Sequence, residues 1–361
     1  MSHQWAAARR ILAIRLDALG DVLMTGPALR ALAANGASVT LLTSPAGAEA
    51  ARLLPGVDDV IAYDAPWMKA TMPRSGADPE HAMVSTLRER RFDAAVIFTV
   101  HSQSPLPAAM LCYLAAVPLR AAHCHENPYQ LLTDWVRDPE PALRRHEVER
   151  QLALVAELGF APADAALAVN LPAEAVQRVD ALLAELGLDG RRPWAVLHPG
   201  ASAPSRRYPI DRYAAVARLL IEEHGWQVAV TGGEDEAELA EQLVDQLRAG
   251  AFSLAGGLSL AELGALLARA PVVIGNNSGP AHLAAAVGTP VVVLYALTNP
   301  QHTPWGVPSR VLFHDVPCRN CASSVCLTGH HLCLLGVPET AVATAAVELY
   351  DATARERVLS A

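Results

Sequence analysis

The sequence predicts an α/β protein made of two doubly wound halves. Its 361 residues are enough for two domains that each bury a core. Apolar, strand-like runs alternate with helical patterns, which is typical of parallel βαβ units. The alternation stops in a Pro- and Ala-rich passage near residues 160–173 and then restarts. We therefore expect an N-terminal domain over residues 1–175, a C-terminal domain over residues 176–338 and a final helix over residues 339–361.

In the first half, short runs rich in Ile, Val, Leu and Ala predict the strands, and longer segments with helical periodicity predict the helices. The predicted strands cover residues 11–16, 38–42, 60–63 and 94–100. The predicted helices follow the first strand to about residue 34 and cover residues 105–116 and 146–158. The apolar stretch at 105–119 is a candidate for membrane contact, but a helix packed on a sheet is the simpler interpretation.

The second half repeats this alternation. Its predicted strands cover residues 194–198, 227–231, 252–254, 272–274 and 290–295. Its predicted helices include residues 211–223, 235–247 and 259–269. Ligands of such sheets bind outside the carboxyl ends of the strands, so we expect two facing halves with a cleft between them.

Composition excludes several classes of function. A formal net charge of −9 disfavours a nucleic-acid partner, whose phosphates require a basic face. Neither a Gly-x-Gly-x-x-Gly turn after a first strand nor a P-loop is present, which disfavours nicotinamide cofactors and P-loop ATP chemistry. Lys69 is the only lysine, so any bound phosphate must be held by arginine or by backbone N–H groups.

The first ten residues hold no hydrophobic stretch of the kind found in secretory signals. No uninterrupted apolar segment approaches the length that spans a bilayer; residues 281–297 come nearest but contain a histidine, a glycine and a proline. We therefore expect a cytoplasmic protein.

A glycine turn at residues 276–282 indicates an anion site. Ser278 is a good N-cap, Gly279 lets a ligand approach the backbone, and Pro280 suits the first helical turn. Because the turn joins a strand-like run to an Ala-rich helix, free N–H groups and the positive helix end would face a phosphate or diphosphate. The alternative is an ordinary strand-to-helix corner of an α/β protein.

Five motifs in order resemble glycosyltransferase family 9, the ADP-heptose:lipopolysaccharide heptosyltransferases. The first is the opening stretch over residues 11–30, with its Arg, Leu-Gly-Asp and Thr-x-Pro-Ala-Leu elements. The others are His-Pro-Gly-Ala-Ser with Arg-Arg-Tyr-Pro (198–209), Gly-Gly-Glu (232–234), the glycine turn (277–282) and Gly-Thr-Pro-Val (288–291). The resemblance implies the GT-B architecture, with two facing Rossmann-like domains. It also implies an acceptor site in the N-terminal domain, a nucleotide-sugar site in the C-terminal domain, and a final helix that crosses back to the first.

The resemblance assigns Asp21 as general base of an inverting, metal-independent transfer, in which the base takes a proton from the attacking acceptor hydroxyl. Helix capping is the alternative role for this aspartate. Asp17 is the competing carboxylate and fits a local loop contact better. Arg206 aligns with a basic residue that touches the donor phosphate, Arg207 could do the same, and the sequence does not separate them.

The remaining site predictions fall into a donor set and an acceptor set. The donor set is Ser202, Arg206, Arg207, Gly232, Glu234, Asn277, Ser278, Gly279, Pro280 and His282. The acceptor set is His101, Ser102, Gln103 and Asn127, polar residues at expected strand ends or loops. The best-known heptosyltransferases carry Asp where Asn277 stands, so the donor sugar is open, because an amide is not a pure acceptor.

Four of the six cysteines cluster near the C-terminus, at Cys318, Cys321, Cys326 and Cys333, with His330 and His331 between the last two. Such spacing is compatible with a structural zinc site, with redox-sensitive disulfides or with unliganded thiols. Cys112 and Cys124 lie apart and fit buried positions.

The leading hypothesis is therefore a glycosyltransferase that moves a heptose from an ADP-sugar onto a lipopolysaccharide-core or other saccharide acceptor. It needs no cofactor for catalysis, and because such acceptors are built on lipid, peripheral contact with the cytoplasmic membrane is expected. One alternative keeps fold and mechanism but uses another nucleotide sugar. The other is a scaffold protein in which the cysteine module is the working part.

Overall fold

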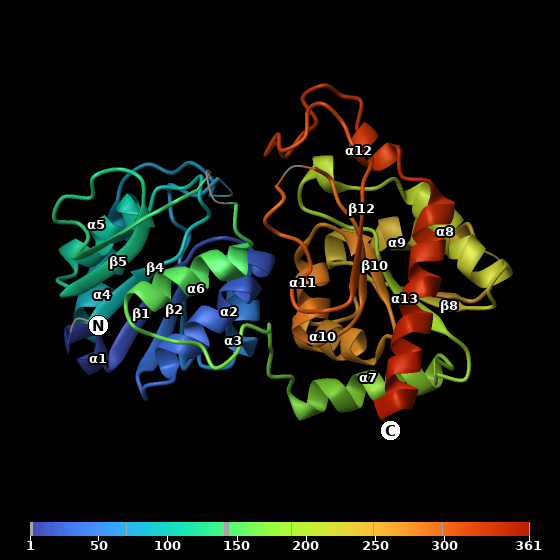
Figure 1. The fold of residues 1–361 in the computed structure, drawn as a ribbon, viewed down its shortest axis with the longest axis horizontal. Coiled ribbons are helices and arrows are strands. Elements are labelled where there is room, and N and C mark those ends of the chain that lie inside the picture. Colours follow the sequence, from blue (N-terminus) through green and yellow to red (C-terminus); the bar gives the residue numbers. More distant parts are fainter. Residues whose placement is uncertain are drawn as a thin grey trace. The chain divides into compact units, whose positions relative to one another are not determined.

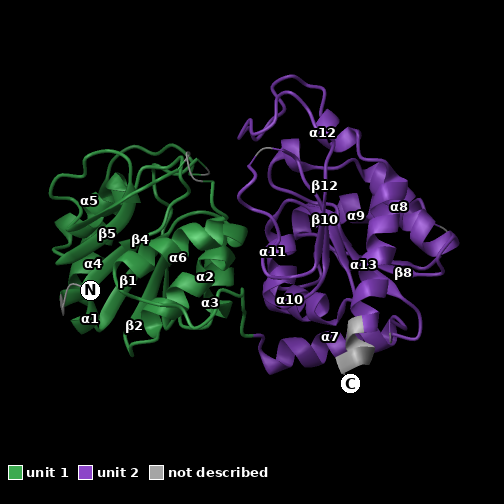
Figure 2. Ribbon diagram, in the orientation of Figure 1, with its two compact units in different colours: residues 1–170 green, residues 171–361 purple. Residues whose placement is uncertain are grey.

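A computed structural model describes residues 3–69, 71–140, 144–188, 190–247, 249–297 and 299–360 of the chain, without the side chains of 356–360. It confirms the α/β class. The chain divides into unit 1, residues 1–170, and unit 2, residues 171–361, each of which is compact (Figure 2). The predicted division lies a few residues later, at 175.

Unit 1 contains a sheet of six parallel strands in the order β3-β2-β1-β4-β5-β6. The strands are β1 (Arg10–Arg15), β2 (Ser38–Thr43), β3 (Asp59–Ala62), β4 (Ala94–Ile97), β5 (Leu119–Cys124) and β6 (Asp134–Arg137). Strands β1 and β4 are almost wholly buried, as expected for central strands covered on both faces. The sequence did not predict β5 or β6.

Helices cover this sheet (Figure 1). They are α1 (His3–Ala7), α2 (Leu19–Ala33), η1 (Pro45–Gly47), α3 (Ala48–Leu53), α4 (Asp78–Arg90), α5 (Leu106–Leu114) and α6 (Glu147–Glu157). The apolar stretch near residue 105 forms α5, which packs into the core with Ala108, Leu111 and Cys112 buried. A capping box of His146 and Glu149 starts α6, and α6 packs against α2.

Unit 2 repeats the same topology. Its strands are β7 (Trp194–His198), β8 (Gln227–Val230), β9 (Ala251–Ser253), β10 (Val273–Asn276), β11 (Val291–Leu294) and β12 (Ser309–Leu312). They are parallel, in the order β12-β11-β10-β7-β8-β9. Numbered along the chain within each unit, both sheets have the order 3-2-1-4-5-6 of a Rossmann fold. The structure confirms the predicted strands of this half and adds β12.

The helices of unit 2 also pack on both faces of its sheet (Figure 1). They are α7 (Ala173–Glu185), η2 (Pro204–Arg206), α8 (Ile210–Glu222), η3 (Glu234–Glu236), α9 (Ala237–Asp245), α10 (Leu260–Arg269), α11 (Gly279–Ala286), α12 (Leu332–Leu335) and α13 (Glu339–Ser360). Among the described helices, none is both long enough and apolar enough to cross a bilayer.

The predicted final helix is α13, whose range of Glu339–Ser360 agrees with the predicted 339–361. It belongs to unit 2 and packs against α8, β11 and β12. Its buried face, Val342, Ala346 and Leu349, recurs at helical spacing and lies in the core of that unit. This apolar stripe anchors α13 to the core of unit 2.

Candidate active site

Each sheet has a switch point, where the chain leaves the first and fourth strands in opposite directions, and such points form ligand sites in open α/β sheets. In unit 1 the switch point lies between β1 and β4, and in unit 2 between β7 and β10. Most predicted site residues sit on the loops that follow these four strands.

In unit 1, a buried guanidinium organises the switch point. The Arg15 side chain is fully buried at the end of β1. It forms ion pairs with Asp17 (Nε to Oδ2, 2.8 Å), Asp21 (Nη2 to Oδ1, 2.9 Å) and Glu147 (Nη1 to Oε1, 2.8 Å). These carboxylates come from the loop after β1, the first turn of α2 and the first turn of α6. One cation therefore fixes three anions from three elements.

Burial and the neighbouring charges shift the pKa values of Arg15 and Asp17 in this cluster. Burial alone would lower the pKa of Arg15, but the charges of Asp17, Glu147 and Asp21 outweigh it and raise that pKa. Burial raises the pKa of Asp17 above its ordinary value, although Arg15 acts in the opposite direction. Arg15 therefore stays charged at any physiological pH.

The three carboxylates differ in access. Glu147 is 1% exposed, Asp17 is 12% exposed and Asp21 is 22% exposed. Glu147 is also held by Gln151, whose amide donates to Oε1 at 2.5 Å. Asp21 is therefore the carboxylate of this cluster that a substrate can most easily reach.

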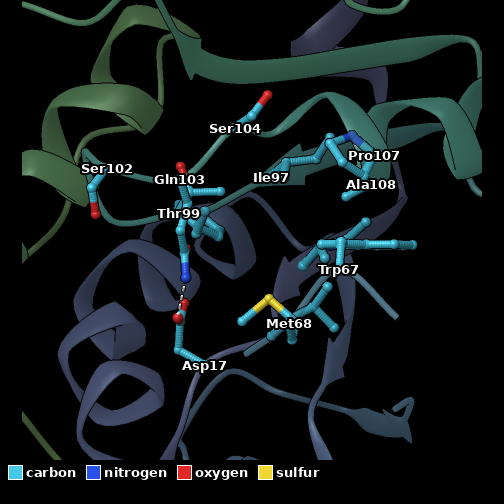
Figure 3. A pocket seen from close by; sticks show the side chains of 13 residues that line it. Asp17, Trp67, Met68, Ile97, Thr99, Ser102, Gln103, Ser104, Pro107 and Ala108 are labelled. Atoms are coloured by element: carbon cyan, nitrogen blue, oxygen red, sulfur yellow. Dashed lines mark hydrogen bonds between the residues drawn. The ribbon is translucent and has the colours of Figure 1, made fainter. Parts of the chain in front are cut away.

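A cavity of about 330 Å³ lies beside the cluster. The Gln103 side chain points towards Asp17 and donates from Nε2 to Oδ1 at 2.7 Å (Figure 3). The polar side chains of the lining are those of Asp17, Thr99, Ser102, Gln103 and Ser104. The apolar part of the wall comes from Leu16, Ile14, Trp67, Met68, Ile97, Phe98, Pro107 and Ala108. This combination suits a ligand with one polar and one apolar face.

Two of the four predicted acceptor residues, Ser102 and Gln103, line this cavity, and the other two are outside its lining. The carbonyl of His101 lies 3.1 Å from Nε2 of His125. Asn127 is exposed and accepts a hydrogen bond from the Tyr129 backbone at 3.0 Å, which shapes a tight turn.

The switch point of unit 2 is built around a buried amide. Asn276 ends β10, and its Oδ1 accepts hydrogen bonds from the Tyr208 backbone and the Tyr213 hydroxyl, both at 3.0 Å. Its Nδ2 donates to the Pro199 carbonyl at 2.7 Å. Both ends of the Asn276 amide therefore have hydrogen-bond partners within the protein. Asn276 holds the loop after β7 against the end of β10 and is not a ligand-binding residue.

The next residues form the predicted helix start. Ser278 occupies the N-cap position of α11 as predicted, but its hydroxyl donates to the Asn276 carbonyl at 3.4 Å instead of capping the helix. Gly279 and Pro280 form the first turn, also as predicted. His282 follows within α11 and is buried. The Ser278 side chain therefore does not cap α11, while the Ser278 carbonyl accepts a hydrogen bond from the Ala281 backbone at 3.1 Å.

The structure separates the two arginines that the sequence could not. Arg206 ends η2, and its buried Nε has no hydrogen-bond partner among the residues that the structure describes. Burial raises the pKa of Tyr295 to about 12, while Arg206 and the side chain of Asn277 act to lower it, so both lie near this hydroxyl. Arg207 is exposed, and its Nε donates to the Ala201 carbonyl at 2.6 Å. The geometry favours Arg206 as the anion ligand.

Comparison with known proteins decides the family. The family model described as glycosyltransferase family 9 (heptosyltransferase) matches residues 81–332, more than half of the chain. This chain belongs to glycosyltransferase family 9.

The chain is similar to lipooligosaccharide heptosyltransferase 2 of Haemophilus influenzae, with 32% identity over 232 residues. It is also similar to lipopolysaccharide heptosyltransferase 2 of Escherichia coli K12, with 30% identity over 228 residues. Each match covers 61% of this chain and 64% of the relative, just under two thirds of the curated protein.

Two solved structures share the fold. A family 9 glycosyltransferase from Veillonella parvula has a TM-score of 0.78 and 22% identity, covering 97% of this chain and 98% of that one. ADP-heptose lipopolysaccharide heptosyltransferase II of E. coli has a TM-score of 0.72 and 24% identity, covering 94% and 98%. With the two Rossmann-like sheets, this likeness confirms the GT-B fold class.

The other predicted donor residues of this family 9 chain lie on neighbouring loops of unit 2. Ser202 is exposed on the loop after β7, and Glu234 is exposed in η3. Gly232 is tightly confined, because a Cβ there would meet the Cβ of Glu236 at 2.9 Å. Glu236 accepts a hydrogen bond from the Gly233 backbone at 3.0 Å and packs against Gly200. Gly232 therefore has a packing role.

Sequence reasoning missed Arg15, Glu147, Trp67 and Met68. Arg15 had a visible signal, because it is the one charged residue in the otherwise apolar predicted strand 11–16. Glu147 lies 132 residues further along the chain, and no local pattern links it to Arg15.

The cysteine segment also belongs to unit 2. Cys318, Cys321, Cys326 and Cys333 line one small cavity together with His330, His331 and nearby residues. All six cysteines of the chain are free thiols in the structure. Cys112 and Cys124 are buried in unit 1, as predicted.

Proposed function

We propose that this chain is an inverting heptosyltransferase that moves a heptose from an ADP-sugar to a saccharide of the lipopolysaccharide core. Membership of family 9 and the names of its relatives support the reaction class. The observation that carries the mechanism is the Asp21 carboxylate, which Arg15 orients at the switch point of unit 1 while part of it stays exposed. The family match begins at residue 81, so the role of Asp21 rests on this geometry and on the opening motif.

In the proposed reaction, the acceptor hydroxyl oxygen forms a bond to the anomeric carbon of the donor sugar. The bond from that carbon to the diphosphate breaks on the opposite face, which inverts the configuration. Asp21 accepts the hydroxyl proton as the oxygen attacks. Arg15 fixes the carboxylate in one orientation, which keeps the base within reach of a bound acceptor.

The leaving ADP needs positive charge, which unit 2 supplies. The buried Arg206 Nε can donate a charge-assisted hydrogen bond to the diphosphate, and the start of α11, which no side chain caps, presents the positive end of that helix. No metal is needed for this step, because a guanidinium and a helix N-terminus stabilise the developing charge. The cavity beside Asp17 would hold the acceptor, with Ser102 and Gln103 as polar contacts.

Asn277 favours a second candidate for the donor. This amide lies beside the Tyr295 hydroxyl, at the position where a carboxylate stands in the best-known heptosyltransferases. An amide presents a donor as well as an acceptor, so it can match a different hydroxyl pattern. The same mechanism with another nucleotide sugar is therefore the alternative function. In either case the acceptor is a glycolipid, so we place the enzyme in the cytoplasm with peripheral membrane contact.

A ligand screen tests the donor. We expect ADP and ADP-heptose to raise the melting temperature of the full chain more than UDP, GDP and their sugars do. Arg206→Ala should weaken this response and Arg207→Ala should not. Mass spectrometry then detects heptose added to a core acceptor. A response to UDP or GDP alone would replace the donor, and no response to any nucleotide would favour the scaffold hypothesis.

A further inference from the structure

The cysteine segment, residues 318–333, forms a site that the transfer reaction does not use. Its four cysteines lie within 16 residues and face one cavity of about 30 Å³. A space of that size holds a water molecule or a single ion, but no organic ligand. The remaining wall comes from Ser205, Leu297 and Val316, so apart from the histidines the thiols are its main chemical groups.

His330 has a defined role beside these thiols. Its Nδ1 accepts a hydrogen bond from the Leu332 backbone at 3.0 Å, which assigns the ring proton of the neutral side chain to Nε2. Nε2 lies 3.5 Å from the Sγ atom of Cys318. In this tautomer Nε2 donates to sulfur, and its lone pair is not available to a metal. His330 is therefore a hydrogen-bond donor to Cys318.

Cys326 receives similar support. Its Sγ atom lies 3.5 Å from the Thr328 hydroxyl. A hydroxyl at this position can donate a hydrogen bond to a metal-bound sulfur.

We propose that Cys318, Cys321, Cys326 and Cys333 together bind one thiophilic metal ion, Zn²⁺ or Fe²⁺, with His330 hydrogen-bonded to the Cys318 thiolate. Four thiolates in a tetrahedral array suit these ions. Each thiol releases its proton to solvent as its sulfur bonds to the ion. In the described residues, no group of three or more His, Cys, Asp or Glu side chains is already arranged to hold a metal ion. Binding therefore draws the cysteine segment in around the ion.

The metal site would also hold the nucleotide-binding part of unit 2 in place. This second inference rests on the proposed function. The Ser205 backbone donates to the Ser324 carbonyl at 3.0 Å, and its hydroxyl donates to the Ser323 carbonyl at 2.7 Å. Asn320 donates from its backbone to the Leu297 carbonyl at 2.6 Å. The segment thus holds η2, which ends at Arg206. An ordered metal site would fix the position of that guanidinium.

Metal analysis of the full chain, purified without chelator under reducing conditions, tests the site. We expect about one equivalent of zinc or iron per chain by mass spectrometry in wild type and in the control Cys112→Ala, and almost none in Cys318→Ser/Cys333→Ser. His330→Gln should keep the metal but bind it roughly 10–100-fold more weakly in a chelator competition. Wild type that contains no metal and takes up neither Zn²⁺ nor Fe²⁺ after reduction would overturn the proposal. Complete metal loss in His330→Gln would overturn the four-cysteine ligand set.

A second readout separates this proposal from the proposed function. ADP affinity is measured on wild type with metal and after its removal, with circular dichroism to confirm that the protein stays folded. Weaker ADP binding without metal supports the bracing role, and unchanged binding overturns it while the site stands. If no form binds a nucleotide but the metal is present, the proposed function fails and the metal site survives.

Discussion

The two switch points of this chain share a topology but have opposite chemistry. In unit 1, three carboxylates surround the single cation Arg15, and a largely apolar cavity lies beside them. In unit 2, the same position in the sheet carries a helix start, the amide of Asn277 and the guanidinium of Arg206. Sheet order fixes where a ligand can bind, while the loops decide which ligand. In the proposed function, unit 1 accepts a proton and unit 2 holds an anion.

The largest expected effect comes from removing the proton acceptor. Asp21→Asn keeps the shape of the side chain and should lower kcat of the transfer by about 10²–10⁴-fold, the usual contribution of a general base. Steady-state kinetics with a saturating donor measure it. Asp17→Asn is the comparison variant, because Asp17 pairs with the same guanidinium and lines the proposed acceptor cavity but is less exposed than Asp21. A larger loss in Asp17→Asn than in Asp21→Asn would move the base to Asp17.

The next effect tests the cation of unit 1. Arg15→Met leaves three carboxylates without their shared partner, two of them strongly buried. Removing one partner of a buried ion pair costs about 3–5 kcal/mol, and we expect a loss of that size in the free energy of unfolding. Urea denaturation measures it. Arg10→Met, at an exposed pair with Asp93, is the control and should change stability by at most about 1 kcal/mol. Equal losses in both variants would contradict the special role of Arg15.

Acid should also weaken the fold through buried histidines. Burial, helped by the Arg150 charge, lowers the pKa of His123 to about 4. Above pH 6.5 both folded and unfolded states leave this ring neutral. As the pH falls from 6.5 to 4, the unfolded state takes up a proton that the folded state does not, so stability is lost, by about 3 kcal/mol at most.

Unfolding curves across this pH range check the effect. His123→Gln should lose less stability than wild type as the pH falls from 6.5 to 4. His198→Gln in unit 2 should also lose less stability than wild type, because burial also lowers the pKa of His198. If the stability of wild type and of His123→Gln falls equally with pH, the folded protein protonates His123 as readily as the unfolded protein does, which would contradict the lowered pKa.

The smallest expected effect tests whether Arg206 in unit 2 binds the diphosphate. Arg206→Ala removes a charge-assisted hydrogen bond worth about 1.5–3 kcal/mol, so the Kd for ADP should rise by roughly 10–100-fold. Arg207→Ala removes a neighbouring charge whose Nε is already bonded to the Ala201 carbonyl, and should change the Kd much less. Isothermal titration calorimetry measures both. A stronger effect at Arg207 would reverse the assignment.

The sequence predicted well what depends on local pattern. Buried strands such as β7 and β11 are continuous apolar runs, and the helix start at Ser278 is a local turn signal. It failed at β5, β6 and β12. Of these, β6 and β12 are short edge strands that are only partly buried and carry charged residues. The pairing of these two edge strands depends on the neighbouring strand and not on their own composition.

The candidate site was predictable in part. The Asp21 and Arg206 motifs were visible, but the contacts that give them roles are tertiary. Arg206 differs from Arg207 only through its burial near Tyr295. The Ser278 hydroxyl was expected to cap α11 and instead turns back to the Asn276 carbonyl, a competition that local propensity does not resolve.

The most direct test of the account is ADP titration into Asp21→Asn beside Arg206→Ala, combined with a transfer assay on the same samples. In the proposed function, unit 1 carries proton transfer and unit 2 carries nucleotide binding. We therefore expect Asp21→Asn to bind ADP as tightly as wild type while transfer is lost, and Arg206→Ala to bind ADP more weakly. Asp21→Asn that binds ADP as weakly as Arg206→Ala, or that keeps wild-type transfer, would contradict this division of labour.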